Sequence, residues 1–191
     1  FPFTIASDTN IRLVEFVPDN KQLVHHVNAH LLTYQETKDS HLLQVPFVNS
    51  EDHTDSSAFY ALNIPYENGG FPILNPSIAN YLPGVEPFIY PEGIGGARIS
   101  KQSALLVKDF HFGPSPKDDW DDSYFNIYFD KEKPKRPLKE LIIGTQGVSP
   151  VSPPLLIAPN IVKEFGSEYT LPEAISVLTL NPHMHLIGKE F

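Results

Sequence analysis

Five histidines are the residues of this chain with the clearest capacity for chemistry. The sequence has eight histidines and no cysteine. The five form three groups: the adjacent pair His25 and His26, the single His111, and His183 with His185 in an H-x-H motif. Imidazole ligands without thiolate suit copper or zinc and are a poor set for magnesium or calcium. The sequence therefore points to a transition-metal site built from histidine.

Spacing decides which of these imidazoles can share an ion. Residues two apart in a strand project from the same face, so His183 and His185 can point at one metal. The alternative for this pair is a polar strand end with solvated histidines. Adjacent strand residues face opposite sides, so His25 and His26 reach one ion only if a β-bulge or a strand end turns one of them. Otherwise one of the two is a hydrogen-bonded core residue and the other faces solvent.

Short runs rich in β-branched and aromatic residues predict the strands that must position these histidines. They cover residues 11–17, 22–34, 42–48, 103–112, 123–129, 139–144 and 174–187, separated by Pro, Gly, Asn or Asp. No helical period persists over ten residues. We therefore expect an all-β fold, a jelly-roll-like β-sandwich.

Two of these runs show how their side chains should alternate. In 123–129, Phe125, Ile127 and Phe129 fall on one face and Tyr124, Asn126 and Tyr128 on the other, as a half-buried strand requires. In 103–112, alternation places Leu105, Val107, Asp109 and His111 on one face and Leu106, Lys108, Phe110 and Phe112 on the other. Neither face of that second run is wholly polar.

The charge balance limits the partners of the chain. It has 14 Lys and Arg against 23 Asp and Glu, a formal net charge of −9, and no basic run that could neutralise a row of phosphates. No stretch approaches the ~20 apolar residues that a membrane helix needs. We expect neither nucleic acid nor membrane insertion, and the sequence does not identify a small-molecule or peptide substrate.

Three segments, taken in order, resemble the copper type II, ascorbate-dependent monooxygenases, the family of peptidylglycine α-hydroxylating and dopamine β-monooxygenases. VEFVPDNKQLVHHV is similar to the stretch in which an adjacent His pair binds the first copper. VKDFHFGPSPKDDWDDSYFNIYF is similar to the segment with the third His of that copper, and LNPHMHLIGKEF to the H-x-H segment that holds the second copper. YLPGVEPFIYPEGIGG resembles the approach to the third-His strand in bacterial members. The likeness runs in order across nearly the whole chain.

The resemblance implies two copper sites. His25, His26 and His111 would bind the electron-transfer copper, and His183 with His185 would bind the catalytic copper. In the family a methionine well downstream of the H-x-H completes the second site, whereas the only methionine here, Met184, lies between the two histidines. We therefore expect one complete and one incomplete copper site in this chain, which would be a fragment of the core.

The same resemblance implies hydroxylation of a C–H bond by molecular oxygen, with electrons from ascorbate or a similar reductant. Residues 1–165 would form the β-sandwich domain with the three-His site. Residues 166–191 would form a linker and the first strand of an incomplete second β domain that carries the H-x-H motif. Export to the periplasm or the cell exterior, and further domains of the parent chain, are also expected.

Two other functions fit the same residues. His183, His185 and Glu190 form H-x-H-x₄-E, which resembles the first metal motif of the cupins and would suit iron, manganese or zinc. Val177 stands where that motif usually opens with glycine. The other alternative is a non-catalytic copper-binding module of a larger exported protein. Substrate-dependent oxygen uptake separates an enzyme from such a module.

Overall fold

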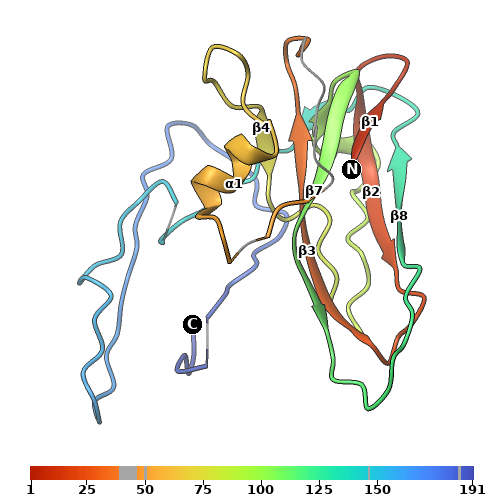
Figure 1. Ribbon diagram of the computed structural model, residues 1–191. Helices are drawn as coiled ribbons and strands as arrows, with labels where there is room; N and C mark the ends of the chain where they lie inside the picture. Colours follow the sequence, from red (N-terminus) through yellow and green to blue (C-terminus); the bar gives the residue numbers. More distant parts are fainter. Residues whose placement is uncertain (39–46, 50, 146, 185) are drawn as a thin grey trace. The chain divides into compact units, whose positions relative to one another are not determined.

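Two compact units divide the chain in the computed structural model, Phe1–Lys139 and Glu140–Phe191. The structure describes residues 1–38, 47–49, 51–145, 147–184 and 186–191. Every helix and strand of the described residues lies in the first unit (Figure 1). The division falls earlier in the chain than the expected boundary at residue 165.

The first sheet has four antiparallel strands in the order β1-β7-β3-β4. Their bounds are β1 (Pro2–Thr4), β3 (Val24–Thr33), β4 (Ile73–Asn75) and β7 (Gln102–Phe112). The long strands β3 and β7 form its centre and pair from Val24 opposite Phe112 to Thr33 opposite Ser103. Segments far apart in the sequence therefore lie side by side, and the histidines of 25–26 come to the same sheet as His111.

The second sheet has three antiparallel strands in the order β6-β2-β8. Their bounds are β2 (Thr9–Val17), β6 (Arg98–Ile99) and β8 (Tyr124–Phe129). Two further short strands, β5 (Ile94–Gly95) and β9 (Arg136–Pro137), form a parallel pair. In β8, Phe125 and Ile127 pack against the core as their alternation predicts, whereas Phe129 at the strand end is exposed.

One hydrophobic core lies between the two sheets. Its buried members from β2 and β3 include Ile11, Val14, Phe16, Val27, Ala29 and Leu31. Burying such side chains between two layers is the main favourable contribution to folding. The structure is thus the all-β sandwich that the alternating apolar runs predict (Figure 1).

A short helix covers part of the outer face of the first sheet. α1 (Asp55–Ala61) begins after Thr54, whose side chain accepts a hydrogen bond from the Ser57 amide at 3.2 Å. Phe59 packs with Leu32 and other residues of a second buried cluster on this face. A seven-residue helix is too short to display a helical period, so the sequence pattern did not indicate it.

The other expected strands have different outcomes. The runs 11–17, 22–34, 103–112 and 123–129 are confirmed as β2, β3, β7 and β8. Residues 42–46 lie outside the described residues. The run 139–144 and the described part of 174–187 contain no strand. An apolar run becomes a strand only when a hydrogen-bonded neighbour accepts it, and the run itself does not supply one.

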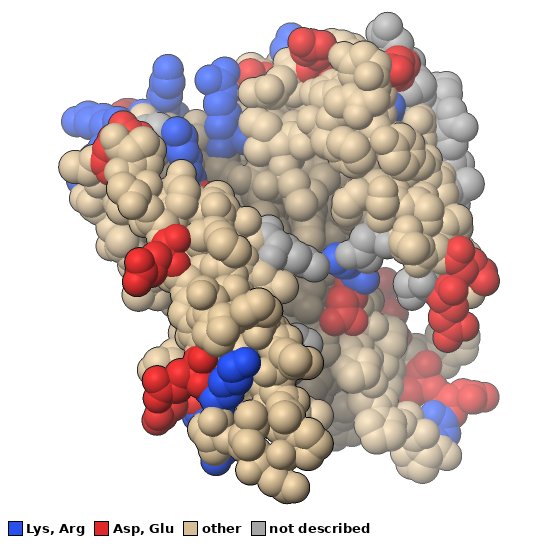
Figure 2. Space-filling view, turned by 90° about the vertical axis from the view of Figure 1, so that its left-hand side faces the viewer, with Lys and Arg blue, Asp and Glu red and all other residues tan. Residues whose placement is uncertain are grey.

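Charged side chains are spread over the face shown in Figure 2. Lys and Arg gather in small groups there, Asp and Glu form others, and large areas between them carry neither. No helix in the described part of the chain has the length and apolar character to cross a membrane.

Candidate metal centre

A β-bulge in β3 decides where the adjacent histidines point. Val24 pairs with Phe112 and His26 pairs with His111. β3 therefore advances two residues where β7 advances one, and His25 is the extra residue. A bulge of this kind bends its strand and re-aims a side chain. The structure thus contains the irregularity that the His25–His26 pair needs if both rings are to reach one ion.

A second bulge, in β7, changes the direction in which the residues after it, among them His111, point. Asn28 pairs with Asp109, and the next residue of β3, Ala29, pairs with Val107. Here β7 advances two residues where β3 advances one, so Lys108 is the extra residue. Alternation of the side chains of β7 is interrupted at this point, because the unpaired residue shifts the following residues by one position.

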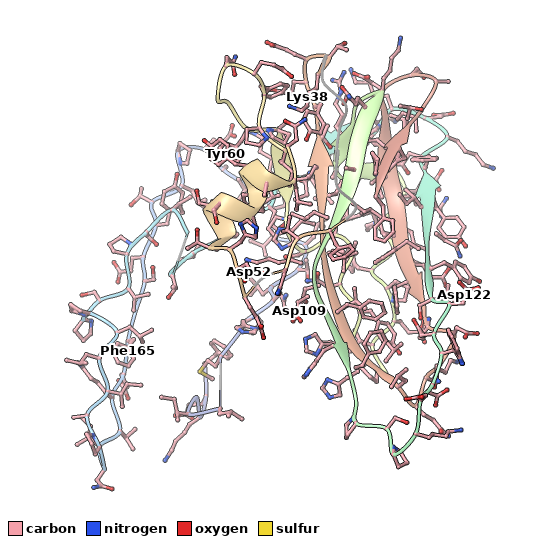
Figure 3. The ribbon with its side chains drawn as sticks, in the orientation of Figure 1. Lys38, Asp52, Tyr60, Asp109, Asp122 and Phe165 are labelled. Carbon is pink, nitrogen blue, oxygen red and sulfur yellow. The ribbon has the colours of Figure 1, made fainter. Side chains whose placement is uncertain are left out.

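The β7 bulge corrects the expected faces of the run 103–112. Val107 packs against the core between the sheets, and beyond the bulge the Phe110 ring meets the core ring of Phe16 at a centroid distance of 5.7 Å. Asp109 then lies on the opposite, outer face (Figure 3). His111, two residues on in β7, shares this face. Simple alternation, which put Val107 with Asp109 and His111, is therefore wrong across Lys108. The outer face is still not wholly polar, because Ala104 belongs to the second buried cluster and Leu106 packs against it.

The two bulges bring three imidazoles together. One ligand atom from each of His25, His26 and His111 lies within 4.8 Å of the other two. The Nδ1 atoms of His25 and His26 are 3.1 Å apart, and the ring centroids of His26 and His111 are 4.9 Å apart. Two nitrogens each ~2.0 Å from one ion at a tetrahedral angle lie about 3.3 Å apart. The nitrogens of His25 and His26 have this spacing, and the three ligand atoms lie close enough together that they could hold one metal ion.

The site is open to solvent on one side. His25 and His111 are exposed, while the His26 side chain keeps only 22% of its surface accessible. An ion held here would have positions left for water or a small molecule, as sites with three protein ligands do. A small reductant could approach it without any movement of the sandwich.

Two polar side chains on the same face support His26. Asp109 Oδ2 lies 2.7 Å from His26 Nε2, and Asn28 Nδ2 donates to the same Oδ2 at 3.2 Å. Sequence reasoning did not assign Asp109 or Asn28 to the site. The available signal was their spacing, since each stands two residues from a histidine of its own strand and so shares its face.

His30 and His53, the other described histidines of the first unit, are not part of this cluster. His183 is exposed and belongs to the second unit, and His185 lies outside the described residues. The H-x-H pair as a metal site thus stays a prediction. His30 is half-buried on β3 opposite Leu106.

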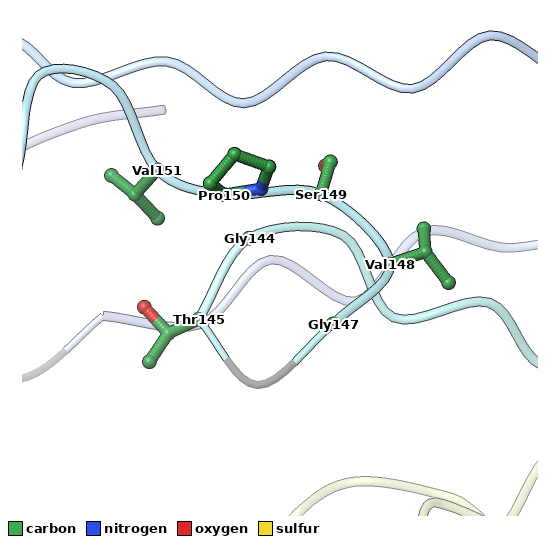
Figure 4. A pocket seen from close by; sticks show the side chains of 7 residues that line it. All are labelled: Gly144, Thr145, Gly147, Val148, Ser149, Pro150 and Val151. Carbon is green, nitrogen blue, oxygen red and sulfur yellow. The ribbon is translucent and has the colours of Figure 1, made fainter.

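The described part of the second unit contains a turn and a backbone bridge. Ser152 and Gly166 exchange two backbone hydrogen bonds of 2.8 Å, which join two extended segments. A shallow pocket of about 450 Å³ lies in the turn between Gly144 and Val151 (Figure 4). None of its lining residues has a titratable side chain, so the pocket supplies neither an acid, a base nor a charged ligand for a metal.

Comparisons with known proteins add no relative. No protein-family model, no curated protein and no solved structure matches the chain. The inference of a metal centre therefore rests on the geometry of the chain's own residues.

Proposed function

We propose that this chain is a copper-binding domain in which His25, His26 and His111 hold one copper ion. The observation that supports this most is the approach of three imidazoles at a pair of β-bulges, with their ligand atoms within 4.8 Å of one another. Imidazole suits copper in both of its oxidation states, and among divalent first-row metals copper forms the most stable complexes with such ligands. Zinc is the other ion that this ligand set fits.

We propose further that this copper is the electron-transfer ion of a copper-dependent monooxygenase core. Copper held by these three imidazoles would supply one-electron chemistry with a reductant such as ascorbate. His25 and His111 lie at the exposed side, where a small reductant has access. In this function the parent protein would hydroxylate a C–H bond of a small molecule or peptide with molecular oxygen, with a second copper at His183 and His185. Export from the cell would accompany it.

Copper stoichiometry tests the three-histidine site. We expect the wild-type chain to bind about one tight copper, seen by metal analysis and by the EPR signal of Cu(II). His26→Ala and His111→Ala should each lose it, because two imidazoles hold the ion far less tightly than three. His183→Ala is the matched control: it also removes one imidazole, but one that lies outside the cluster, so the tight copper should remain.

Other results would contradict these proposals at different levels. A chain that binds no copper, or one whose copper depends on His183 or His185 alone, would remove the three-histidine site and favour the cupin-like function. A chain that binds zinc tightly but copper only weakly would support the three-histidine metal site and contradict copper as its ion. A parent protein that holds copper and shows no oxygen uptake with any substrate of a broad panel would weaken the monooxygenase proposal and favour a non-catalytic copper-binding module.

A further inference from the structure

We infer that Asp109 is a positioning residue of the metal centre: its carboxylate holds His26 in the tautomer with the proton on Nε2, which directs the Nδ1 lone pair to the ion. This inference rests on the proposed copper site. It concerns a residue that does not itself belong to the ligand set, and it specifies which nitrogen of His26 binds.

The contact between His26 and Asp109 fixes the position of the proton. The two atoms, Nε2 and Oδ2, are 2.7 Å apart, within the range of charge-assisted hydrogen bonds. An ionised carboxylate can only accept, so the ring nitrogen must donate. A neutral imidazole with its proton on Nε2 has its lone pair on Nδ1. A metal ligand needs that lone pair.

The Nδ1 atom of His26 faces the other imidazoles. This atom lies 3.1 Å from Nδ1 of His25. The centroid of the His26 ring lies 4.9 Å from that of His111, closer than the His25 ring at 5.5 Å. If Nδ1 of His26 has the lone pair, His25 must donate the hydrogen bond between them in the metal-free protein. For His25 to bind an ion through Nδ1, its proton would move through solvent from Nδ1 to Nε2, which leaves the Nδ1 lone pair for the ion. His26 would bind through Nδ1 without a change in its position.

Asn28 and the bulge at Lys108 hold Asp109 in place. Asn28 is the cross-strand partner of Asp109 and donates to the oxygen that accepts from His26, at 3.2 Å. Without the extra residue Lys108, Asp109 would fall on the other face of β7. The Asp109 side chain is half exposed, so its effect comes from direction and proximity and not from burial. Outer partners of metal-bound histidines typically change metal affinity by ~10–100-fold.

The first test measures copper affinity by competition with a chelator of known strength. Asp109→Leu, which has a similar shape and no acceptor, should raise the dissociation constant for Cu(II) ~10–100-fold. Asp109→Asn should have a smaller effect, because its amide oxygen still accepts but carries no charge. Glu15→Gln is the control: it also removes one negative charge, from a carboxylate that accepts from Asn126 and Tyr128 on the other sheet.

The second test needs no copper. In ¹⁵N NMR of the metal-free chain, His26 should carry its proton on Nε2, and Asp109→Leu should remove this preference while Glu15→Gln keeps it. A merely structural role of Asp109 would change the unfolding temperature and leave the tautomer as it is. If Asp109→Leu does not fold, the wild-type tautomer and the affinity of Asp109→Asn decide.

The two proposals fail separately. A wild-type His26 with its proton on Nδ1, or copper binding by folded Asp109→Leu equal to that of the wild type, overturns the inference and leaves the copper site intact. A wild-type chain without tight copper overturns the proposed function, whereas the ¹⁵N measurement still reports whether Asp109 sets the tautomer of His26.

Discussion

Copper is expected to stabilise the folded chain by about 4 kcal/mol when the free ion is present at a thousand times its dissociation constant. The reason is that the folded state assembles three ligands that the unfolded chain cannot hold together. His25 and His26 are adjacent in the sequence, but His111 reaches them only through the pairing of β3 with β7. Urea unfolding with and without copper measures the difference in the free energy of unfolding.

His111→Ala provides the comparison for this effect. The variant keeps the two adjacent histidines, which the unfolded chain also has, and loses the ligand that only folding brings in. Copper should therefore stabilise it by at most a small fraction of the wild-type value. An equal shift in His111→Ala would mean that the ion binds elsewhere on the folded chain. A chelator should return the wild type to its metal-free stability.

Leu31→Ala is expected to lower the free energy of unfolding by about 2–5 kcal/mol. Leu31 has no exposed surface, lies in the core between the sheets and pairs across strands with Leu105. Shortening it removes buried apolar contact and leaves a cavity that two paired sheets cannot close easily. Chemical denaturation of the metal-free chain measures the loss directly, without a contribution from copper.

Leu82→Ala is the matched control for the core substitution. It makes the same chemical change at a side chain that is 52% exposed. Its effect should stay within about 0.5 kcal/mol. Comparable losses in the two variants would contradict a core between the sheets at Leu31. Leu31 is not one of the proposed copper ligands. Leu31→Ala should therefore still bind one copper under all conditions in which it remains folded.

The fold follows from the sequence where local pattern decides the structure. The runs that became β2, β3, β7 and β8 have alternating or continuous apolar side chains, which suit a strand between two layers. The run 139–144 has comparable composition and forms no strand. Its composition gives a propensity, but pairing depends on a partner elsewhere in the chain, which a local pattern does not contain.

The candidate site also shows which features a local sequence pattern predicts and which depend on pairing between distant strands. From the sequence, His25, His26 and His111 are candidate ligands, and the adjacent pair can share an ion only at a β-bulge or a strand end. The sequence could not show that the bulge exists, since a bulge is a property of the register between two distant strands. Asp109 was missed although alternation places it on the same face as His111, two residues on. Its contact with His26 depends on the register of β3 against β7, which reasoning about one strand at a time does not supply.

The two bulges compensate each other. Between the pair Val24–Phe112 and the pair Ala29–Val107, each strand advances by five residues, although in between the pairing departs from the regular ladder. The one extra residue in β3 is balanced by the one extra residue in β7. The rest of the first sheet therefore keeps the pairing register that two regular strands would have. Each strand nevertheless changes its alternation across this stretch, because Val24 and Ala29 both face the core although they stand five residues apart. A sheet of the same register without the bulges would therefore turn different side chains to the core and would not assemble the ligand cluster, so overall fold alone is a poor guide to which sheets bind a metal.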